Sequence, residues 1–192
     1  MPKIAVLISG GGSNLQSLID NIKSKNLKCS IDFVIADREC SGIKRAEDEG
    51  IKAVVLDRKK YKNTLSEKIS GILDGNVDFI VLAGFLSILN PEFVQKWERK
   101  IINIHPSLLP KYGGAGMYGI KIHEAVIKNK EKESGCTVHY VDTGIDTGEI
   151  IIQEKVPVLP EDTPETLQQK VLKKEHEILT EAVKKVFTAK NI

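Results

Sequence analysis

Four groups of residues in this 192-residue chain have types and spacing that suit ligand binding or catalysis. The first group, residues 9–14, reads Ser-Gly-Gly-Gly-Ser-Asn between an apolar run and a helical pattern. Glycines let a ligand approach the backbone, and the free N–H groups of a helix N-terminus favour a phosphate. The segment therefore predicts a phosphate site, with a plain tight turn as the alternative. It fits the dinucleotide fingerprint only in part, because Leu15 stands where the third glycine belongs.

The second group is residues 103–110, which follow an apolar run and read Asn-Ile-His-Pro-Ser-Leu-Leu-Pro. Asn103 and His105 alternate with apolar neighbours, so in an extended segment both point to the same side. Open parallel sheets bind ligands beyond the carboxyl ends of their strands, and histidine titrates near neutrality, at about 6.5. The pair is a candidate for catalysis. The alternative is a histidine packed in the core.

Acidic residues make up the other two groups. Residues 142–149 include two aspartates, Asp142 and Asp146, but lack the alternating ligands of a calcium-binding EF-hand loop, so no metal is predicted. This segment is either a solvated turn or a source of a carboxylate that holds a histidine protonated. Glu175 falls on the apolar stripe of the last predicted helix and needs a partner. That partner is either a Lys or Arg side chain or a substrate amine.

Alternating strand and helix patterns position these groups in the first half of the chain. Helical patterns begin at Ser13 as N-cap, at Ser41, at a Thr64–Glu67 capping box and at Asn90. Continuous apolar runs, typical of strands buried on both faces, cover residues 4–8, 31–36, 53–56, 79–83 and 101–104. This alternation predicts an open, mostly parallel twisted sheet with helices on both faces.

The second half of the chain begins with an irregular segment. Residues 108–119 contain Pro110 and four glycines, which predicts a long loop of functional interest. We expect a helix at 122–128, strands at 136–141 and 150–156, and a last helix that starts at Thr163-Pro164. The apolar stripe of that helix comprises Leu167, Val171, Leu172, Ile178, Leu179, Ala182, Val183 and Val186.

Composition sets the class of protein. The chain is 41% apolar and 28% charged with a net charge of +2, which is ordinary for a globular protein and too even for a dedicated nucleic-acid binder. At about 150 residues per domain, we expect one domain over residues 1–192. No apolar stretch has the length of a membrane span, and no secretory signal is recognisable, so we expect a cytoplasmic protein without membrane or nucleic-acid partners.

Several of these segments together resemble one enzyme family. Residues 8–15, 81–85, 103–110, 137–141 and the Asp146-Thr147-Gly148 triplet are similar, in this order, to segments of the phosphoribosylglycinamide formyltransferases, which are folate-dependent enzymes of purine synthesis. The match extends over almost the whole chain. Two departures are Ser87, where many members carry Arg, and the missing proline after Tyr112.

The resemblance implies a formyltransferase fold with a Rossmann-like N-terminal half and transfer of a formyl group from 10-formyltetrahydrofolate to the amine of glycinamide ribonucleotide. It implies a phosphate-binding half at 1–104, a folate-binding and catalytic half at 105–192, and no metal. The catalytic residues would be Asn103, His105 and Asp146. The ribonucleotide would bind to Gly12, Ser13 and Asn14 through its phosphate and to Glu175 through its amine. Folate would contact Leu86, Ser87, Ile88, Leu89, Asn103, Asp142, Thr143, Gly144, Ile145, Asp146 and Lys62.

Two other functions compete with this interpretation. A small NAD-dependent oxidoreductase is suggested by Gly10, Gly12 and Asp37, which fit part of a dinucleotide site. A module that binds phosphorylated sugars without chemistry is the other rival. Asn103, His105 and Asp146 in one motif order argue against both. In each case the partners are small molecules, and the protein is a monomer or a homodimer.

Overall fold

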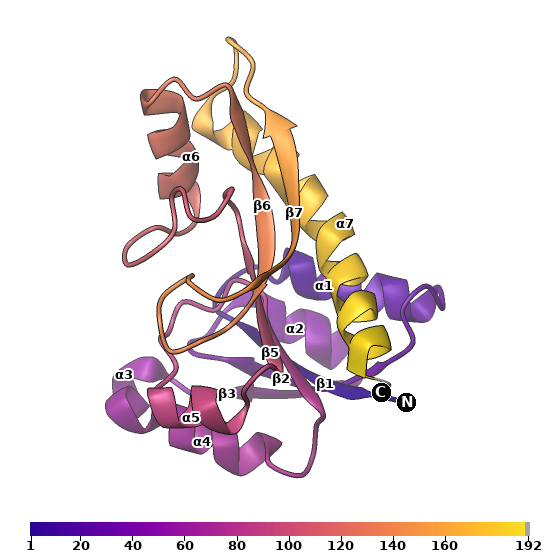
Figure 1. The fold of residues 1–192 in the computed structure, drawn as a ribbon. Helices are drawn as coiled ribbons and strands as arrows, with labels where there is room; N and C mark the ends of the chain where they lie inside the picture. Colours follow the sequence, from indigo (N-terminus) through magenta and orange to yellow (C-terminus); the bar gives the residue numbers. More distant parts are fainter. Residues whose placement is uncertain (191–192) are drawn as a thin grey trace.

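Seven strands form a single sheet in the order β3-β2-β1-β4-β5-β6-β7 (Figure 1). The structure is a computed structural model that describes residues 1–190; residues 191 and 192 of the expected domain lie outside the described residues. The pairs from β3 to β5 are parallel, whereas β6 and β7 run antiparallel. The predicted α/β class with a mostly parallel sheet is therefore confirmed. The strands are β1 (Lys3–Ile8), β2 (Ser30–Ala36), β3 (Lys52–Val55), β4 (Phe79–Leu82), β5 (Ile101–His105), β6 (Glu133–Tyr140) and β7 (Ile150–Pro157).

Helices cover both faces of the sheet, as the continuous apolar runs predict. In β1, Ile4, Val6 and Ile8 point into one core, and Ala5 and Leu7 point into the other. The first core is closed by α1 (Ser13–Lys23), α2 (Ser41–Asp48), α6 (Ile120–Lys128) and α7 (Pro164–Lys190). The second is closed by α4 (Leu65–Leu73) and α5 (Pro91–Lys96).

The order of the strands determines where the site lies. The strand β1 lies between β2 and β4. The connections that leave these two neighbours therefore turn to opposite faces of the sheet. Ligands of open α/β sheets bind at such a switch point, beyond the carboxyl ends of the strands. The residues that follow β1, β4 and β5 meet there. Residues 106–119, which follow β5, contain neither helix nor strand, as predicted.

Two helix starts differ from the prediction. The N-cap of α1 is Gly12 with φ +70°, and Ser13 is already the first helical residue. Thr64 makes no capping hydrogen bond to α4, and its hydroxyl donates to the carbonyl of Tyr61. Two short elements were not expected, α3 (Arg58–Tyr61) and the 3-10 turn η1 (Lys62–Thr64). The cap at Asn90 is confirmed, since its Oδ1 accepts from the Phe93 N–H at 2.9 Å.

The last helix joins the two halves of the chain. Along its length, α7 packs against α1, α6, β6 and β7 (Figure 1). Most of its predicted apolar stripe is buried, but Leu172 is only partly buried and lines a cavity instead. No helix within residues 1–190 combines the length and apolar character that crossing a membrane requires.

Candidate active site

A cavity of about 690 Å³ opens at the carboxyl edge of the sheet. Its walls come from the loop after β1, the segment after β4, the end of β5, the loop 106–119, the turn after β6 and the middle of α7. Every site residue predicted from the sequence lines this cavity, with Lys62 as the exception among residues 1–190. Lys62 lies in the 3-10 turn η1, and its contact with folate stays a prediction.

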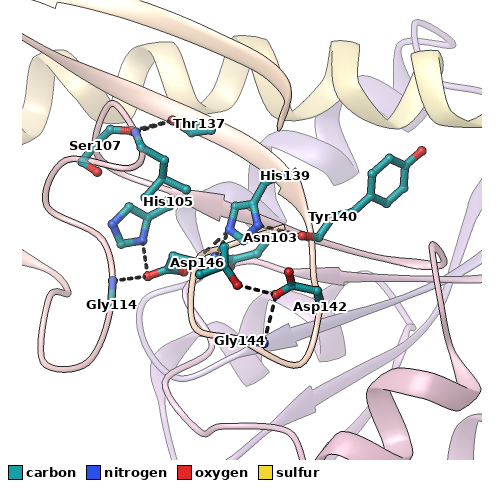
Figure 2. A network of polar contacts seen from close by, with 12 residues as sticks. Asn103, His105, Ser107, Gly114, Thr137, His139, Tyr140, Asp142, Gly144 and Asp146 are labelled. Atoms are coloured by element: carbon teal, nitrogen blue, oxygen red, sulfur yellow. Dashed lines mark hydrogen bonds and ion pairs between the residues drawn. The ribbon is translucent and has the colours of Figure 1, made fainter. Parts of the chain in front are cut away.

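Four polar side chains meet in the centre of the cavity (Figure 2). Asn103 and His105 come from β5 and share a side, as predicted. His139 comes from β6, where it pairs directly opposite Asn103. Asp146 faces both histidines: its Oδ2 is 3.5 Å from His105 Nδ1, and its Oδ1 is 3.6 Å from His139 Nε2.

The turn after β6 is shaped to hold Asp146 in this position. Asp146 has φ +58°, and its Oδ2 accepts a 2.9 Å hydrogen bond from the Gly114 N–H of the neighbouring loop. Asp142 organises the turn, because its Oδ1 accepts from the Gly144 N–H and from the Thr147 hydroxyl. A Cβ at Gly148 would clash with the carbonyl of Tyr140. The segment is therefore an ordered support for one carboxylate rather than a plain solvated turn.

The two nitrogens of His105 both face acceptors. Nε2 lies 2.8 Å from the carbonyl oxygen of Tyr112, which only accepts, so Nε2 carries a hydrogen. Nδ1 faces the Asp146 carboxylate. The Nε2–H can donate to a developing negative charge, and a second hydrogen on Nδ1 would face the carboxylate.

Burial nevertheless dominates the pKa of His105. Because the ring is buried, its pKa lies below the usual value, although the Asp146 charge and the Tyr112 carbonyl raise it in part. The sequence predicts that the Asp146 carboxylate holds His105 protonated. The carboxylate does raise the pKa of His105, as predicted, but burial lowers that pKa by more, so the prediction is wrong for the net change. Burial also raises the pKa of Asp146, but His139, His105 and the Gly114 N–H together bring it below the usual value.

His139 is the one member of the four central side chains that the sequence analysis did not assign to the site. Its Nδ1 donates to the Tyr140 carbonyl at 2.8 Å, so in the neutral ring Nε2 accepts from the Asn103 amide at 3.1 Å. That contact orients Asn103 and leaves the second N–H of the amide for a ligand. Its alternation with Val138 along β6 was visible in the sequence, but the pairing with Asn103 required knowledge of the strand register.

The predicted phosphate loop lies at one end of the cavity. Its Gly12 approaches α2 so closely that a Cβ there would lie 2.9 Å from the Cα of Gly42. Gly42 in turn donates its N–H to the carbonyl of Gly10 at 3.1 Å, and Arg45 donates from Nε to the carbonyl of Gly11 at 2.8 Å. Packing against α2 therefore fixes the loop, and the N-terminus of α1 faces the cavity through Ser13 and Asn14.

Glu175 on α7 reaches the same end of the cavity. Its Oε2 accepts a 2.8 Å hydrogen bond from Asn14 Nδ2, and burial raises the pKa of its carboxyl. No Lys or Arg forms an ion pair with it among residues 1–190, so the salt-bridge alternative is wrong. The carboxylate is available to a ligand beside the phosphate loop.

Apolar groups form another part of the cavity wall. Leu86, Ile88 and Ile145 are exposed there, and Ile88 has 74% of its surface accessible. Ser87 donates to Asp37 Oδ2 at 2.6 Å, so its hydroxyl is used within the protein. This part of the wall suits a flat, largely apolar ligand that also makes backbone hydrogen bonds.

The structure removes the main argument for a dinucleotide site. Asp37 follows β2, as the fingerprint requires, but the residue is fully buried. Its carboxylate accepts hydrogen bonds from Arg38 and Ser87, so it has no free face for a ribose. We found no cluster of three or more His, Cys, Asp or Glu side chains that could hold a metal ion in the described part of the chain.

Comparison with known proteins gives one consistent result. Residues 2–183 match the model of the family described as Formyl transferase. The chain is 40% identical over 185 residues to "Phosphoribosylglycinamide formyltransferase, chloroplastic" of Vigna unguiculata, covering 94% of this chain and 59% of that protein. It is 43% identical over 188 residues to "Trifunctional purine biosynthetic protein adenosine-3" of Homo sapiens, covering 96% of this chain and 18% of that protein.

Bacterial relatives and solved structures match over more of their length. The Haemophilus influenzae phosphoribosylglycinamide formyltransferase is 41% identical over 188 residues, which cover 96% of this chain and 86% of that protein. The crystal structure of phosphoribosylglycinamide formyltransferase from Bacillus halodurans superimposes with a TM-score of 0.90 at 34% identity, covering 96% and 95% of the two chains. The Brucella melitensis structure gives a TM-score of 0.86 at 38% identity, covering 96% and 94%.

Proposed function

This chain belongs to the formyl transferase family, and from that premise we propose that it transfers a formyl group from 10-formyltetrahydrofolate to the amine of glycinamide ribonucleotide. The products are formylglycinamide ribonucleotide and tetrahydrofolate. The observation that carries the proposal is the lining of one cavity, which contains Asn103, His105 and Asp146 together with a phosphate loop and an apolar rim. The names of the relatives at about 40% identity support the choice of substrates.

Different parts of the cavity wall suit the two substrates. The phosphate binds the N–H groups of Gly12, Ser13 and Asn14 at the start of α1, where the helix dipole favours an anion. Glu175 accepts a hydrogen bond from the ribonucleotide, either from its amine, as expected from the sequence, or from a hydroxyl. The pterin of the folate binds at Leu86–Leu89 and at the turn 142–146, largely through backbone groups. The central side chains then lie between the amine and the formyl group.

The reaction needs a hydrogen-bond donor that stabilises the developing negative charge, and a path for one proton. The amine nitrogen attacks the formyl carbon, which forms a C–N bond and a tetrahedral intermediate with an oxyanion. The free N–H of the Asn103 amide and the Nε2–H of His105 donate to this oxygen. The bond from carbon to the folate nitrogen then breaks, and the proton lost by the amine passes to that nitrogen through a held water or His105.

His105 must change partners for this role. Asp146 occupies its Nδ1 and fixes the ring, so we assign the oxyanion to Nε2, whose partner in the free protein is the Tyr112 carbonyl. The formyl oxygen therefore displaces that carbonyl. The proposal thus couples substrate binding to a movement of the loop that contains Tyr112.

Turnover tests the proposed function directly. Purified protein is incubated with 10-formyltetrahydrofolate and glycinamide ribonucleotide, and the deformylated folate is followed by absorbance. Ribose 5-phosphate, which lacks the amine, replaces the ribonucleotide in the control and gives no signal. Absence of turnover together with tight NAD binding would favour the oxidoreductase, and ribonucleotide binding without turnover would favour the sugar-phosphate module. A cytoplasmic location and a monomeric or homodimeric state remain part of the proposal, and two plant relatives are named as chloroplastic.

A further inference from the structure

The imidazole of His123 is a buried polar group that the proposed chemistry does not use. It lies near the start of α6, directly after the loop 106–119, and lines the cavity although only 1% of the residue is accessible. Its Nδ1 is buried and has no hydrogen-bond partner among the described residues. A buried polar atom without a partner destabilises a fold, so its presence in a cavity wall points to a partner that arrives with a ligand.

The state of the ring limits the kind of ligand group. No charged side chain forms an ion pair with His123 in the part of the chain that the structure describes, and burial lowers its pKa to about 4. Near pH 7 the ring is therefore neutral, with one nitrogen that donates and one that accepts. Such a ring suits an uncharged polar group, such as a hydroxyl or an amide, better than a phosphate.

A second unpaired atom belongs to another residue of the cavity wall. Asn14 donates from Nδ2 to Glu175, and this contact leaves its Oδ1 buried without a partner. The helices α1, α6 and α7 thus each contribute a polar side chain, Asn14, His123 and Glu175, to the walls of one cavity. The oxygens of Asn14 and Glu175 accept, and a neutral His123 adds a donor. A ligand with both donors and acceptors would satisfy all three.

We propose that His123 binds the ribosyl-glycinamide part of the ribonucleotide through a hydrogen bond from its imidazole. The inference rests on the proposed function, which supplies the substrate. It assigns His123 to binding and specificity rather than to the chemical step. It also places the first turn of α6, and not only the phosphate loop and Glu175, in the ribonucleotide site.

Two substitutions separate this role from a structural one. His123→Leu keeps a similar volume and removes both nitrogens, whereas His123→Gln restores a side chain that donates. Titration calorimetry with glycinamide ribonucleotide should show about tenfold weaker binding to the Leu variant, as for loss of one hydrogen bond, and partial recovery in the Gln variant. A folate analogue should bind all three proteins equally. The Tm of the Leu variant should be no lower than that of the wild type, because an unpaired buried polar atom is removed.

A measurement on the wild-type protein guards against a variant that does not fold. The ¹⁵N resonances of the His123 ring should shift when the ribonucleotide is added and stay in place when only the folate analogue is added. Unchanged ribonucleotide affinity in a folded Leu variant, equal weakening of both ligands, or unmoved ring resonances would each overturn the inference alone. If the wild type does not bind the ribonucleotide at all, the proposed function fails and the inference fails with it.

Discussion

The amide of Asn14 and the carboxylate of Glu175, 161 residues apart in the sequence, are joined by a buried 2.8 Å hydrogen bond. Asn14 belongs to the first turn of α1, at the phosphate loop, and Glu175 belongs to the middle of α7. The bond therefore fixes the position of a buried carboxylate relative to the phosphate loop. Any ligand whose phosphate binds at Gly12 and Ser13 meets this carboxylate within the same cavity.

This pair gives the first prediction. Glu175→Gln removes the charge but keeps an oxygen that can accept from Asn14, so the fold should be preserved. Affinity for glycinamide ribonucleotide should fall about tenfold, as expected for the loss of a charge-assisted hydrogen bond, whereas folate affinity stays unchanged. Calorimetry with each ligand measures this. Ribose 5-phosphate serves as the matched ligand: its affinity falls too if Glu175 contacts a hydroxyl, and is unaffected if Glu175 contacts the amine. Equal loss for ribonucleotide and folate would point to a purely structural role.

The second prediction concerns the chemical step. His105→Ala removes the proposed donor to the oxyanion, and loss of one such donor typically costs about 100 to 1,000-fold in rate. Single-turnover measurements should show this loss with substrate affinities close to those of the wild type. Thermal unfolding of the variant provides the control for folding. Near-normal turnover in a folded His105→Ala protein would exclude His105 from catalysis.

The third prediction tests the influence of Asp146 on His105. Burial lowers the pKa of His105 and the Asp146 charge opposes this effect. Asp146→Asn removes the charge but retains an oxygen that can accept from the Gly114 N–H, so the pKa of His105 should fall further. An NMR titration of the His105 ring measures the shift. A pKa of His105 that does not change, with the loop still ordered, would show that the two groups do not interact.

The fourth prediction is a dependence of stability on pH. Burial lowers the pKa of His123 from 6.5 to about 4 in the folded protein, so the unfolded chain binds a proton more readily between these values. Stability from this group is therefore complete above about pH 6.5 and is lost as the pH falls towards 4, by up to about 3 kcal/mol. Denaturant unfolding at several pH values should show this loss, and His123→Leu should reduce its slope. The pKa values of His105 and His176, also lowered by burial, act in the same direction and remain in the variant.

The fifth prediction concerns the loop 106–119. Its base is anchored, since Ser107 donates to the Lys111 carbonyl, and the Tyr112 hydroxyl donates to Glu131. Tyr118, near the far end, is 45% exposed. If the loop closes over the substrates and excludes water, chymotrypsin should cleave after Tyr118 in the free protein and more slowly with ribonucleotide and a folate analogue present. The variant Tyr118→Leu serves as the matched control, because it keeps a cleavage site of similar exposure at the same position. Identical cleavage rates with and without ligands would exclude a lid.

Much of the fold could be predicted because the patterns that indicate its strands and helices lie within short segments of the sequence. A run such as residues 4–8, apolar at every position, requires burial on both faces, and its alternation between two cores follows from strand geometry. The common side of Asn103 and His105 follows from the same alternation. The role of His139 could not be predicted, because it depends on which residue of β6 lies opposite Asn103, a property of two segments about forty residues apart.

The errors were at positions where tertiary contacts decide. Ser13 has the residue type of an N-cap, but the chain enters α1 through the left-handed conformation of Gly12. A Lys or Arg partner for Glu175 was reasonable from its residue type alone, yet the partner is a neutral amide from the other end of the sequence. The pKa of His105 depends on how deeply the ring is buried. The depth of burial cannot be read from the charged residues near it in the sequence.

The position of α7 has a consequence for protein synthesis. The helix that completes the ribonucleotide end of the cavity is translated long after the loop 9–14, with which it shares that end. A nascent chain can form β1 and α1 early, but it lacks Glu175 until α7 has left the ribosome. A product truncated before residue 175 would therefore lose most of the helix that packs against α1 and lack a complete ribonucleotide site.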